Sequence, residues 1–146
     1  MIDTILIVCE GNICRSPMAR GLLAKELPRA RITSAGLGAL VGRQADPLAI
    51  ELMAEREIDI SGHVASALSL QDVRAAQLVL TMTLEQRRRI EANYSFVKGK
   101  VYRLGEHEGL DVLDPYRRGR AAFEMSLVQI ERSLSRWLEA MIPLVH

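Results

Sequence analysis

Residues 9–17 decide how this chain folds, and they read Cys9-Glu10-Gly11-Asn12-Ile13-Cys14-Arg15-Ser16-Pro17. Before them stands an apolar run, residues 5–8, with the length and composition of a buried strand. After them, residues 17–27 have a helical pattern. Ser16 suits the N-cap position of that helix, and Pro17 suits its first turn, where a missing N–H costs nothing. The stretch therefore predicts a strand, a tight loop and a helix in succession.

A loop of this kind can form an oxyanion site. Gly11 and Asn12 enter the left-handed region of backbone space most easily, so the loop can curl tightly. Backbone N–H groups in a tight loop that ends at a helix N-terminus point into one concavity, which attracts an anion. Arg15 can close this concavity with a guanidinium fork that matches two phosphate oxygens.

Cys9 lies at the other lip of the same loop. Helix N-termini and neighbouring cations stabilise a thiolate, so we expect Cys9 to be ionised at neutral pH. A thiolate beneath a bound phosphate is placed for in-line attack on phosphorus. Cys9 is therefore the predicted nucleophile, and the product of its attack is a phosphocysteine intermediate.

Two other interpretations of the cysteines are weaker. A zinc site needs more ligands than Cys9 and Cys14 supply, so neither a metal nor another cofactor is expected. An ordinary buried thiol at a strand end is the usual role of a free cysteine. The spacing from Cys9 to Arg15, taken with the Gly-Asn and Ser-Pro pairs, favours the phosphate site.

Composition limits the classes of partner. The 146 residues suit one domain, residues 1–146. Lys and Arg total 19 against 18 for Asp and Glu, so no nucleic-acid partner is expected. No signal peptide is expected, and the longest apolar runs are too short for membrane insertion. Two cysteines within one loop favour a reducing cytoplasm. The expected oligomeric state is a monomer or a weak homodimer.

The remaining pattern alternates strands with helices. Strands are predicted at 4–8, 31–34, 77–81 and 101–104, the last at an edge. Residues 35–38 are expected to end the second strand. Helices are predicted at 17–27, at 47–57 with Asp46 as N-cap, as a short turn at 69–73, and after the cap Thr83. In the last helix an apolar stripe is expected to be core, and it comprises Phe123, Leu127, Ile130, Leu134, Trp137 and Met141.

This alternation predicts an α/β fold. The expected architecture is a single-domain three-layer sandwich, a four-stranded parallel sheet with helices on both faces. Ligands of such sheets bind beyond the carboxyl ends of the strands. Residues 9–17 and 105–119 both follow strands, so we expect them to meet at that edge.

The chain resembles the low-molecular-weight protein tyrosine phosphatases over nearly its whole length. The resemblance begins with residues 8–17 and continues, in the family's order, through Ser34-Ala35-Gly36, residues 58–63, residues 78–82 and Asp114-Pro115-Tyr116. More narrowly, it resembles bacterial members that act on autophosphorylated tyrosine kinases of capsule and exopolysaccharide export. The resemblance implies that Ser34 and His63 buttress the phosphate loop. It also implies a phosphotyrosine protein as the partner, with such a kinase as the expected one.

A general acid is needed to protonate the leaving oxygen. Asp114 is the candidate, because Pro115 restricts its backbone to an extended conformation and so fixes the direction of its carboxylate. Glu106, Glu108 and Asp111 share the loop as rivals, and the match to the family motif decides for Asp114. Once ionised, the same group can act as the base for the water that cleaves the phosphocysteine.

Several loop residues are expected to contact substrate. Ile13 and Tyr116 can sandwich an aromatic ring, which favours phosphotyrosine over phosphoserine. The resemblance also implies that Ile13 argues against a protein-arginine phosphatase, since relatives with that activity tend to carry Thr at this position. Ser16 either caps the helix only or also donates to the leaving thiolate. The substrate-binding residues predicted are Glu10, Gly11, Asn12, Ile13, Cys14, Arg15, Ser16 and Tyr116.

Cys14 has a predicted redox role. An accessible thiolate such as Cys9 is readily oxidised to a sulfenic acid, which a neighbouring thiol can capture as a disulfide. Cys14 would be that resolving thiol, and the alternative is a small buried filler of the loop. Spacing alone does not show that the two sulfurs come within disulfide range.

The sequence contains two short basic clusters. Residues 87–89 are interpreted as solvated surface, whereas Arg117 and Arg118 adjoin the acid loop and can attract an acidic phosphopeptide.

An arsenate reductase of the same fold needs redox cysteines downstream of Cys14, and none exists. The intact set of Cys9, Arg15 and Asp114 argues against a non-catalytic phosphotyrosine-binding module. The sequence therefore favours a protein-tyrosine-phosphatase.

Overall fold

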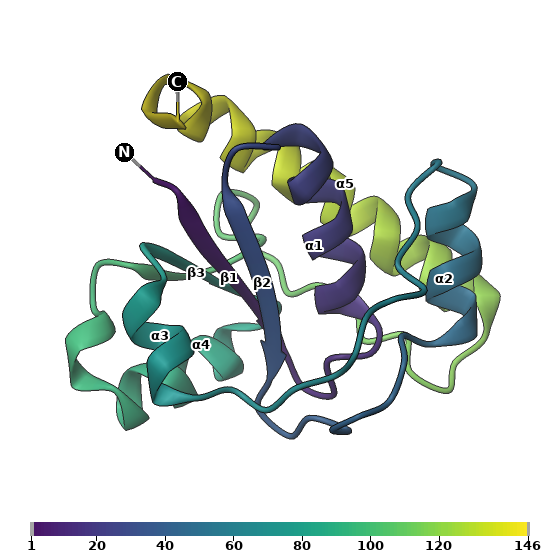
Figure 1. The fold of residues 1–146 in the computed structure, drawn as a ribbon, viewed down its shortest axis with the longest axis horizontal. Helices are drawn as coiled ribbons and strands as arrows, with labels where there is room; N and C mark the ends of the chain where they lie inside the picture. The colour runs from purple at the N-terminus through teal and green to yellow at the C-terminus, as the bar shows by residue number, and fades with distance from the viewer. Residues whose placement is uncertain (1, 146) are drawn as a thin grey trace.

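A computed structural model describes residues 2–145 and contains one four-stranded parallel sheet (Figure 1). The strand order is β2-β1-β3-β4, so β1 and β3 lie in the centre and β4 lies at an edge, as predicted. The strands are β1 (Thr4–Cys9), β2 (Arg31–Gly36), β3 (Leu78–Thr81) and β4 (Val101–Arg103).

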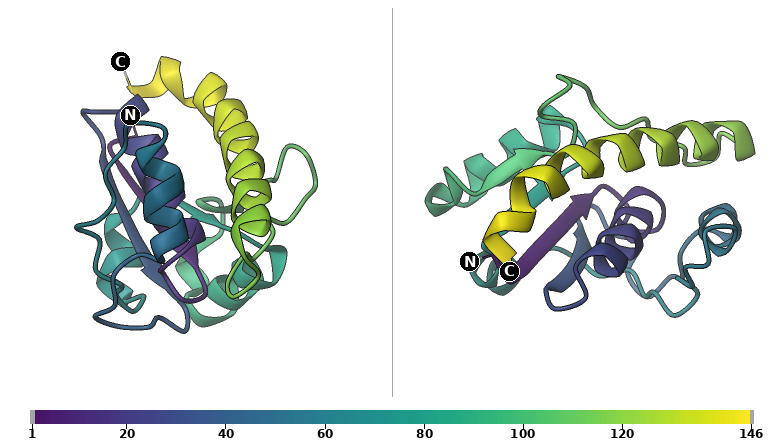
Figure 2. Two further views of the ribbon diagram at one scale, coloured as in Figure 1. Left: turned by 90° about the vertical axis from the view of Figure 1, so that its right-hand side faces the viewer. Right: turned by 90° about the horizontal axis from the view of Figure 1, so that it is seen from above.

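Helices cover both faces of this sheet (Figures 1 and 2). On one face lie α1 (Arg15–Glu26) and the long α5 (Arg120–Val145), with α2 (Pro47–Ala54) packed against both. On the other face lie α3 (Leu70–Ala75), α4 (Leu84–Asn93) and the short 3-10 turn η1 (Ser95–Val97). This arrangement confirms the α/β architecture predicted from the sequence.

The central strand β1 explains the two layers. Ile5, Ile7 and Cys9 point into the core beneath α1 and α5, whereas Leu6 and Val8 point into the core beneath α3 and α4. A parallel strand buried on both faces needs apolar side chains at every position, because its neighbours cover both sides. The run of residues 5–8 is therefore the sequence of a central strand.

The apolar stripe of α5 is core, as predicted. Phe123, Leu127, Ile130, Leu134 and Met141 are buried in the larger cluster, and Trp137 packs partly buried against it. The Trp137 indole N–H donates to the carbonyl oxygen of Leu104 at 2.7 Å, which ties α5 to the end of β4.

Two of the predicted boundaries were wrong at the phosphate loop. Helix α1 begins at Arg15 with Cys14 as its N-cap, so Ser16 does not cap the helix and Pro17 is its third residue. Strand β2 runs on through Ala35 and Gly36, which pair with Val8 and Cys9 of β1. Both differences arise from partners that are distant in the sequence. Ser16 contacts Cys9 instead of capping the helix, and pairing with β1 extends the second strand through Ala35 and Gly36.

The other boundaries are closer to prediction. Asp46 caps α2 by accepting from the Leu48 N–H, and Thr83 caps α4 within a capping box. Helix α2 ends at Ala54 rather than near Glu57, which adopts a positive φ of 61° and turns the chain away. None of the helices in the described part of the chain combines the length and the apolar character that crossing a membrane requires.

Candidate active site

Three segments close around one cavity of about 160 Å³ at the carboxyl edge of the sheet. They are the loop after β1, the loop after β2 and the segment that precedes α5. The cavity is lined by Cys9, Glu10, Gly11, Ile13, Cys14, Arg15, Gly38, Leu40, Asp114 and Tyr116. The structure thus brings the two predicted loops together and adds residues 38–40, which the sequence analysis did not place there.

Asn12 lies behind this cavity and holds the loop in shape. Its φ of 60° makes it the left-handed residue of the loop, whereas Gly11 does not adopt a positive φ. The Asn12 side chain is fully buried. Its amide nitrogen donates to Ser16 Oγ at 2.7 Å and to Ser34 Oγ at 3.1 Å, and its Oδ1 accepts from the Ser66 N–H at 2.9 Å.

The backbone of Asn12 is held as well. His63 Nε2 lies 2.6 Å from the Asn12 carbonyl oxygen, which can only accept, so Nε2 carries the hydrogen. Ser34 and His63 therefore contact the loop from behind, in the buttressing positions that the family resemblance implied.

The Cys9 sulfur receives two hydrogen bonds. The Asn12 N–H donates to Sγ at 3.2 Å, and Ser16 Oγ lies 2.8 Å from Sγ. Because Ser16 Oγ already accepts from Asn12, its own hydrogen is free to donate to sulfur. Both contacts favour negative charge on sulfur, and they explain why the Ser16 hydroxyl is not available to cap α1.

Free donors surround the space above the sulfur. Within residues 2–145, the amides of Gly11, Ile13 and Cys14 donate to no protein acceptor, and they lie just before the first turn of α1. Arg15 is almost completely buried, and its Nη1 donates to the Val112 carbonyl oxygen at 3.0 Å. Such an arrangement of amides, helix terminus and guanidinium fits a tetrahedral oxyanion.

Asp114 is the only one of the four candidate acids that lines the cavity. Its Oδ2 lies 3.6 Å from Arg15 Nη2, its side chain is 54% exposed, and its Oδ1 accepts from the Tyr116 N–H. The rivals are engaged elsewhere. Glu106 pairs with Arg87, Asp111 pairs with Arg103, and Glu108 accepts from Ser133.

The loop that carries Gly38 and Leu40 is docked by backbone hydrogen bonds. The N–H groups of Leu37, Gly38 and Leu40 donate to the carbonyl oxygens of residues 9, 10 and 11. Leu40 adds an apolar side chain to the wall that Ile13 and Tyr116 were predicted to form. The closely spaced glycines at 36 and 38 were the only feature of the sequence that could have indicated this docked loop. A Cβ at Gly36 would lie 2.6 Å from the Glu10 carbonyl oxygen.

The basic cluster at residues 87–89 is not simply solvated surface, as the sequence suggested. Arg87 pairs with Glu106, and Arg89 Nη1 lies 2.8 Å from Oε1 of Glu10 in the phosphate loop. Helix α4 places both arginines beside loops that are distant in the sequence. The residues next to Arg87 and Arg89 in the chain therefore did not indicate these partners.

Cys14 is buried beside Cys9. Burial raises the pKa of the Cys14 thiol well above its ordinary value, and the negative charges of Asp46, Cys9 and Asp114 raise it further. Cys14 is therefore a protonated thiol at neutral pH.

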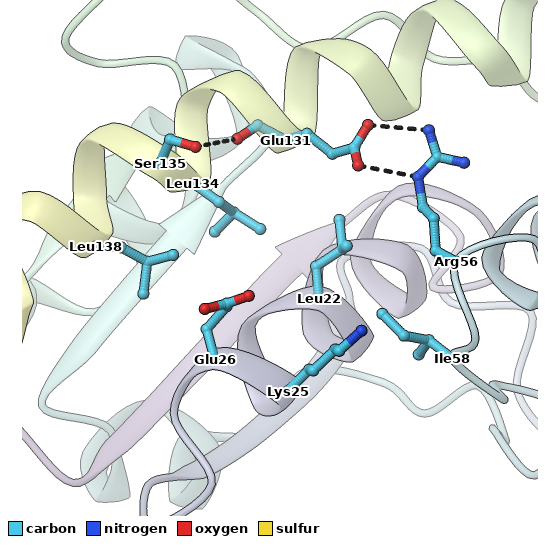
Figure 3. Close-up of a pocket in the computed structure, with 9 residues that line it drawn as sticks. All are labelled: Leu22, Lys25, Glu26, Arg56, Ile58, Glu131, Leu134, Ser135 and Leu138. Atoms are coloured by element: carbon cyan, nitrogen blue, oxygen red, sulfur yellow. Dashed lines mark hydrogen bonds and ion pairs between the residues drawn. The ribbon is translucent and has the colours of Figure 1, made fainter.

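Another cavity, of about 360 Å³, lies between α1 and α5 (Figure 3). Its walls are Leu22, Ile58, Leu134 and Leu138, and the bidentate Arg56–Glu131 ion pair stands at one side of it. It contains neither a cysteine nor a helix N-terminus, so the chemistry predicted from the sequence belongs to the smaller cavity.

Comparison with known proteins agrees with this geometry. Residues 4–143 match the family model described as low molecular weight phosphotyrosine protein phosphatase. The chain belongs to this family. Its function is accordingly that of a protein-tyrosine-phosphatase, as the sequence predicted.

Two curated relatives cover the phosphatase almost completely. A probable low molecular weight protein-tyrosine-phosphatase, EpsP of Ralstonia solanacearum, is 50% identical over 138 residues, which are 94% of this chain and 95% of the relative. The low molecular weight protein-tyrosine-phosphatase Wzb of Escherichia coli K12 is 40% identical over 142 residues, 97% of each chain.

A solved structure has the same fold. The tyrosine phosphatase Wzb from Escherichia coli K30, determined in complex with sulphate, superposes with a TM-score of 0.91 at 34% identity. The match covers 97% of this chain and 99% of that one.

The phosphatase should lose stability as protonation of His63 becomes favourable. Burial lowers the pKa of His63 below its ordinary 6.5; the hydrogen bond to Asn12 opposes this shift, and the charge of Arg20 adds to it. The unfolded chain therefore binds the proton first as the pH falls. The contribution of His63 to stability is complete above pH 6.5 and decreases below it.

Urea unfolding between pH 7.5 and 5 measures this effect. His63→Gln removes the titrating ring but retains an N–H donor, so its stability should depend less on pH than that of the wild type. Parallel curves for the two proteins would contradict the assignment.

Proposed function

We propose that the phosphatase hydrolyses phosphotyrosine through a phosphocysteine formed on Cys9. Arg15 binds the phosphate, and Asp114 serves as general acid and then as general base. One observation carries this proposal. Cys9, Arg15 and Asp114 line a single cavity, and so do Gly11, Ile13 and Cys14, whose amides have no acceptor within residues 2–145.

The first step transfers the phosphoryl group to sulfur. The Cys9 thiolate attacks phosphorus, the bond between phosphorus and the tyrosine oxygen breaks, and protonated Asp114 gives its proton to that oxygen. The free amides and Arg15 stabilise the charge on the equatorial oxygens. The hydrogen bonds from Ser16 and Asn12 keep the thiolate ready to attack.

The second step releases phosphate. Ionised Asp114 removes a proton from a water molecule, whose oxygen attacks phosphorus as the sulfur–phosphorus bond breaks. Ser16 then donates to the leaving thiolate. The position of Asp114 suits both steps, because its carboxylate is exposed at the cavity mouth yet held near Arg15.

The walls of the cavity support an aromatic substrate. Ile13, Leu40 and Tyr116 give the cavity an apolar rim above the polar base formed by the loop. A phenyl ring fits between such side chains and reaches a nucleophile that is only 2% exposed. The short stem of phosphoserine would not bring its phosphate to that depth.

The proposed partner is an autophosphorylated bacterial tyrosine kinase of polysaccharide export. The similarity to the protein-tyrosine-phosphatases EpsP and Wzb supports a phosphotyrosine protein as substrate. The choice of a kinase rests on the resemblance to the bacterial members described in the sequence analysis. We also propose a cytoplasmic location, since free thiols such as Cys9 and Cys14 persist in a reducing compartment.

Cys14 is proposed as a resolving thiol. Peroxide oxidises the Cys9 thiolate to a sulfenic acid, and the Cys14 thiol then displaces water from it to form a Cys9–Cys14 disulfide. Both cysteines line the same cavity, which supports their proximity. Reduction by two external thiols would return both cysteines.

Replacing the nucleophile should remove catalysis and keep binding. Cys9→Ser is expected to abolish turnover of p-nitrophenyl phosphate while retaining the circular dichroism spectrum and phosphate binding, because the cradle consists of amides and Arg15. The same variant should retain the phosphorylated kinase in a pull-down that excess vanadate prevents. Substantial residual turnover would overturn the mechanism.

Removing the acid should slow the first step in proportion to the need for a proton. Asp114→Asn should lower kcat/KM, which reports the steps up to the phosphocysteine, by roughly 10²–10⁴-fold for a phenyl phosphate with a basic leaving group. The loss should be smaller for leaving groups that depart without a proton. Asp111→Asn is the matched control, since its carboxylate pairs with Arg103 outside the cavity. Equal losses of kcat/KM for all leaving groups would instead indicate a structural role for Asp114.

The redox proposal predicts a separation of activity from recovery. Cys14→Ser should keep near-normal phosphatase activity but fail to recover after peroxide followed by dithiothreitol, because sulfinic and sulfonic forms of Cys9 accumulate. Mass spectrometry should find the Cys9–Cys14 disulfide in the oxidised wild type. Full recovery of the variant, or the absence of that disulfide, would reduce Cys14 to a packing residue.

A further inference from the structure

The phosphate loop carries a carboxylate at an unfavourable place. Glu10 follows Cys9 directly, and its side chain lines the cavity that is to receive a phosphate dianion. A free carboxylate at this position would repel the substrate, because like charges a few ångströms apart interact unfavourably even near the protein surface.

The structure shows what holds this carboxylate. Oε1 of Glu10 lies 2.8 Å from Arg89 Nη1, and a Cβ at Gly38 would lie only 2.6 Å from Oε2. The carboxylate thus rests between α4 and the bare backbone of Gly38. The Gly38 N–H also donates to the Glu10 carbonyl oxygen at 2.9 Å, so the main chains of the same two residues are joined as well.

Arg89 is itself oriented by a second acid. Glu85, one turn earlier on α4, lies 3.5 Å from Arg89 Nε and leaves Nη1 directed at Glu10. The Arg89 and Glu10 side chains are 40% and 45% exposed, so salt can reach the pair and screen it. The neighbouring Arg88 is exposed and forms no ion pair within residues 2–145.

We propose that Arg89 is a positioning residue for phosphate binding, which holds Glu10 against Gly38 and neutralises its charge at the wall of the cavity. The inference rests on the phosphate site proposed above. Arg89 does not touch the substrate in this scheme. It acts through Glu10, and its effect therefore depends on whether Glu10 carries a charge.

The test compares steady-state kinetics of p-nitrophenyl phosphate hydrolysis for a set of variants. Arg89→Gln should raise KM by about threefold to tenfold at about 0.02 M ionic strength with little change in kcat, and the effect should shrink at about 0.5 M. The inhibition constant of inorganic phosphate should rise in parallel. Arg89→Lys retains a positive charge and should restore most of the affinity.

Two further variants separate this role from a general loss of charge or of folding. Arg88→Gln removes the same charge from the same helix and should leave KM unchanged. Glu10→Gln removes the carboxylate, so adding Arg89→Gln to it should have no further effect on KM. Equal effects of the Arg88 and Arg89 variants, or a full Arg89 effect in the Glu10→Gln background, would overturn the proposal.

These outcomes are distinct from failure of the proposed phosphate site. If Cys9→Ser retained turnover, the mechanism itself would be wrong, whereas the Arg89 series compares KM values among active enzymes. Thermal unfolding of each variant provides the remaining control, because a merely structural role would lower Tm in both Glu10 backgrounds.

Discussion

The active site depends on the conformation of one buried residue, Asn12. A fully buried amide must have its polar atoms satisfied, and Asn12 uses both side-chain hydrogens, its side-chain oxygen, its N–H and its carbonyl oxygen. These bonds hold a left-handed φ that would otherwise be unfavourable for a residue with a Cβ. With Asn12 in place, its own N–H donates to the Cys9 sulfur, and the amides of Gly11, Ile13 and Cys14 are left without an acceptor within residues 2–145. The phosphate cradle is therefore the outer surface of a hydrogen-bond network whose centre lies in the protein interior.

The sheet then brings the acid to this cradle. Strand β3 separates β1 from β4, yet the chain after β4 returns to the carboxyl edge because Leu104 donates to Thr81 and Val112 donates to Met82. Arg15 binds the returning segment by donating a hydrogen bond to the Val112 carbonyl oxygen. Asp114, two residues later, thus reaches the mouth of the cavity. Arg15 consequently has a structural task besides the phosphate binding proposed for it, since its hydrogen bond to Val112 also anchors the segment that carries the proposed acid.

The sequence by itself determined the parts of this protein that local periodicity and spacing encode. The apolar run of residues 5–8 indicated a central strand, and the stripe of residues 123–141 indicated the buried face of α5. Asp46 and Thr83 marked helix starts, because a capping side chain acts on backbone groups only two or three residues away. Residues 9–17 indicated a phosphate loop for the same reason, since the features that suit it to an anion lie within one short stretch.

Only the tertiary structure decided the features that depend on distant partners. Ser16 is a good N-cap by local rules, but the proximity of Cys9 and Asn12 takes its hydroxyl away from the helix. Arg89 looked like one charge in a solvated run until packing placed Glu10 beside it. The family motif had already favoured Asp114, but only the fold shows that Glu106, Glu108 and Asp111 are engaged outside the cavity. In each case a polar group has several possible partners. Which partner it pairs with, and how deeply it is buried, depends on elements that lie far apart in the sequence.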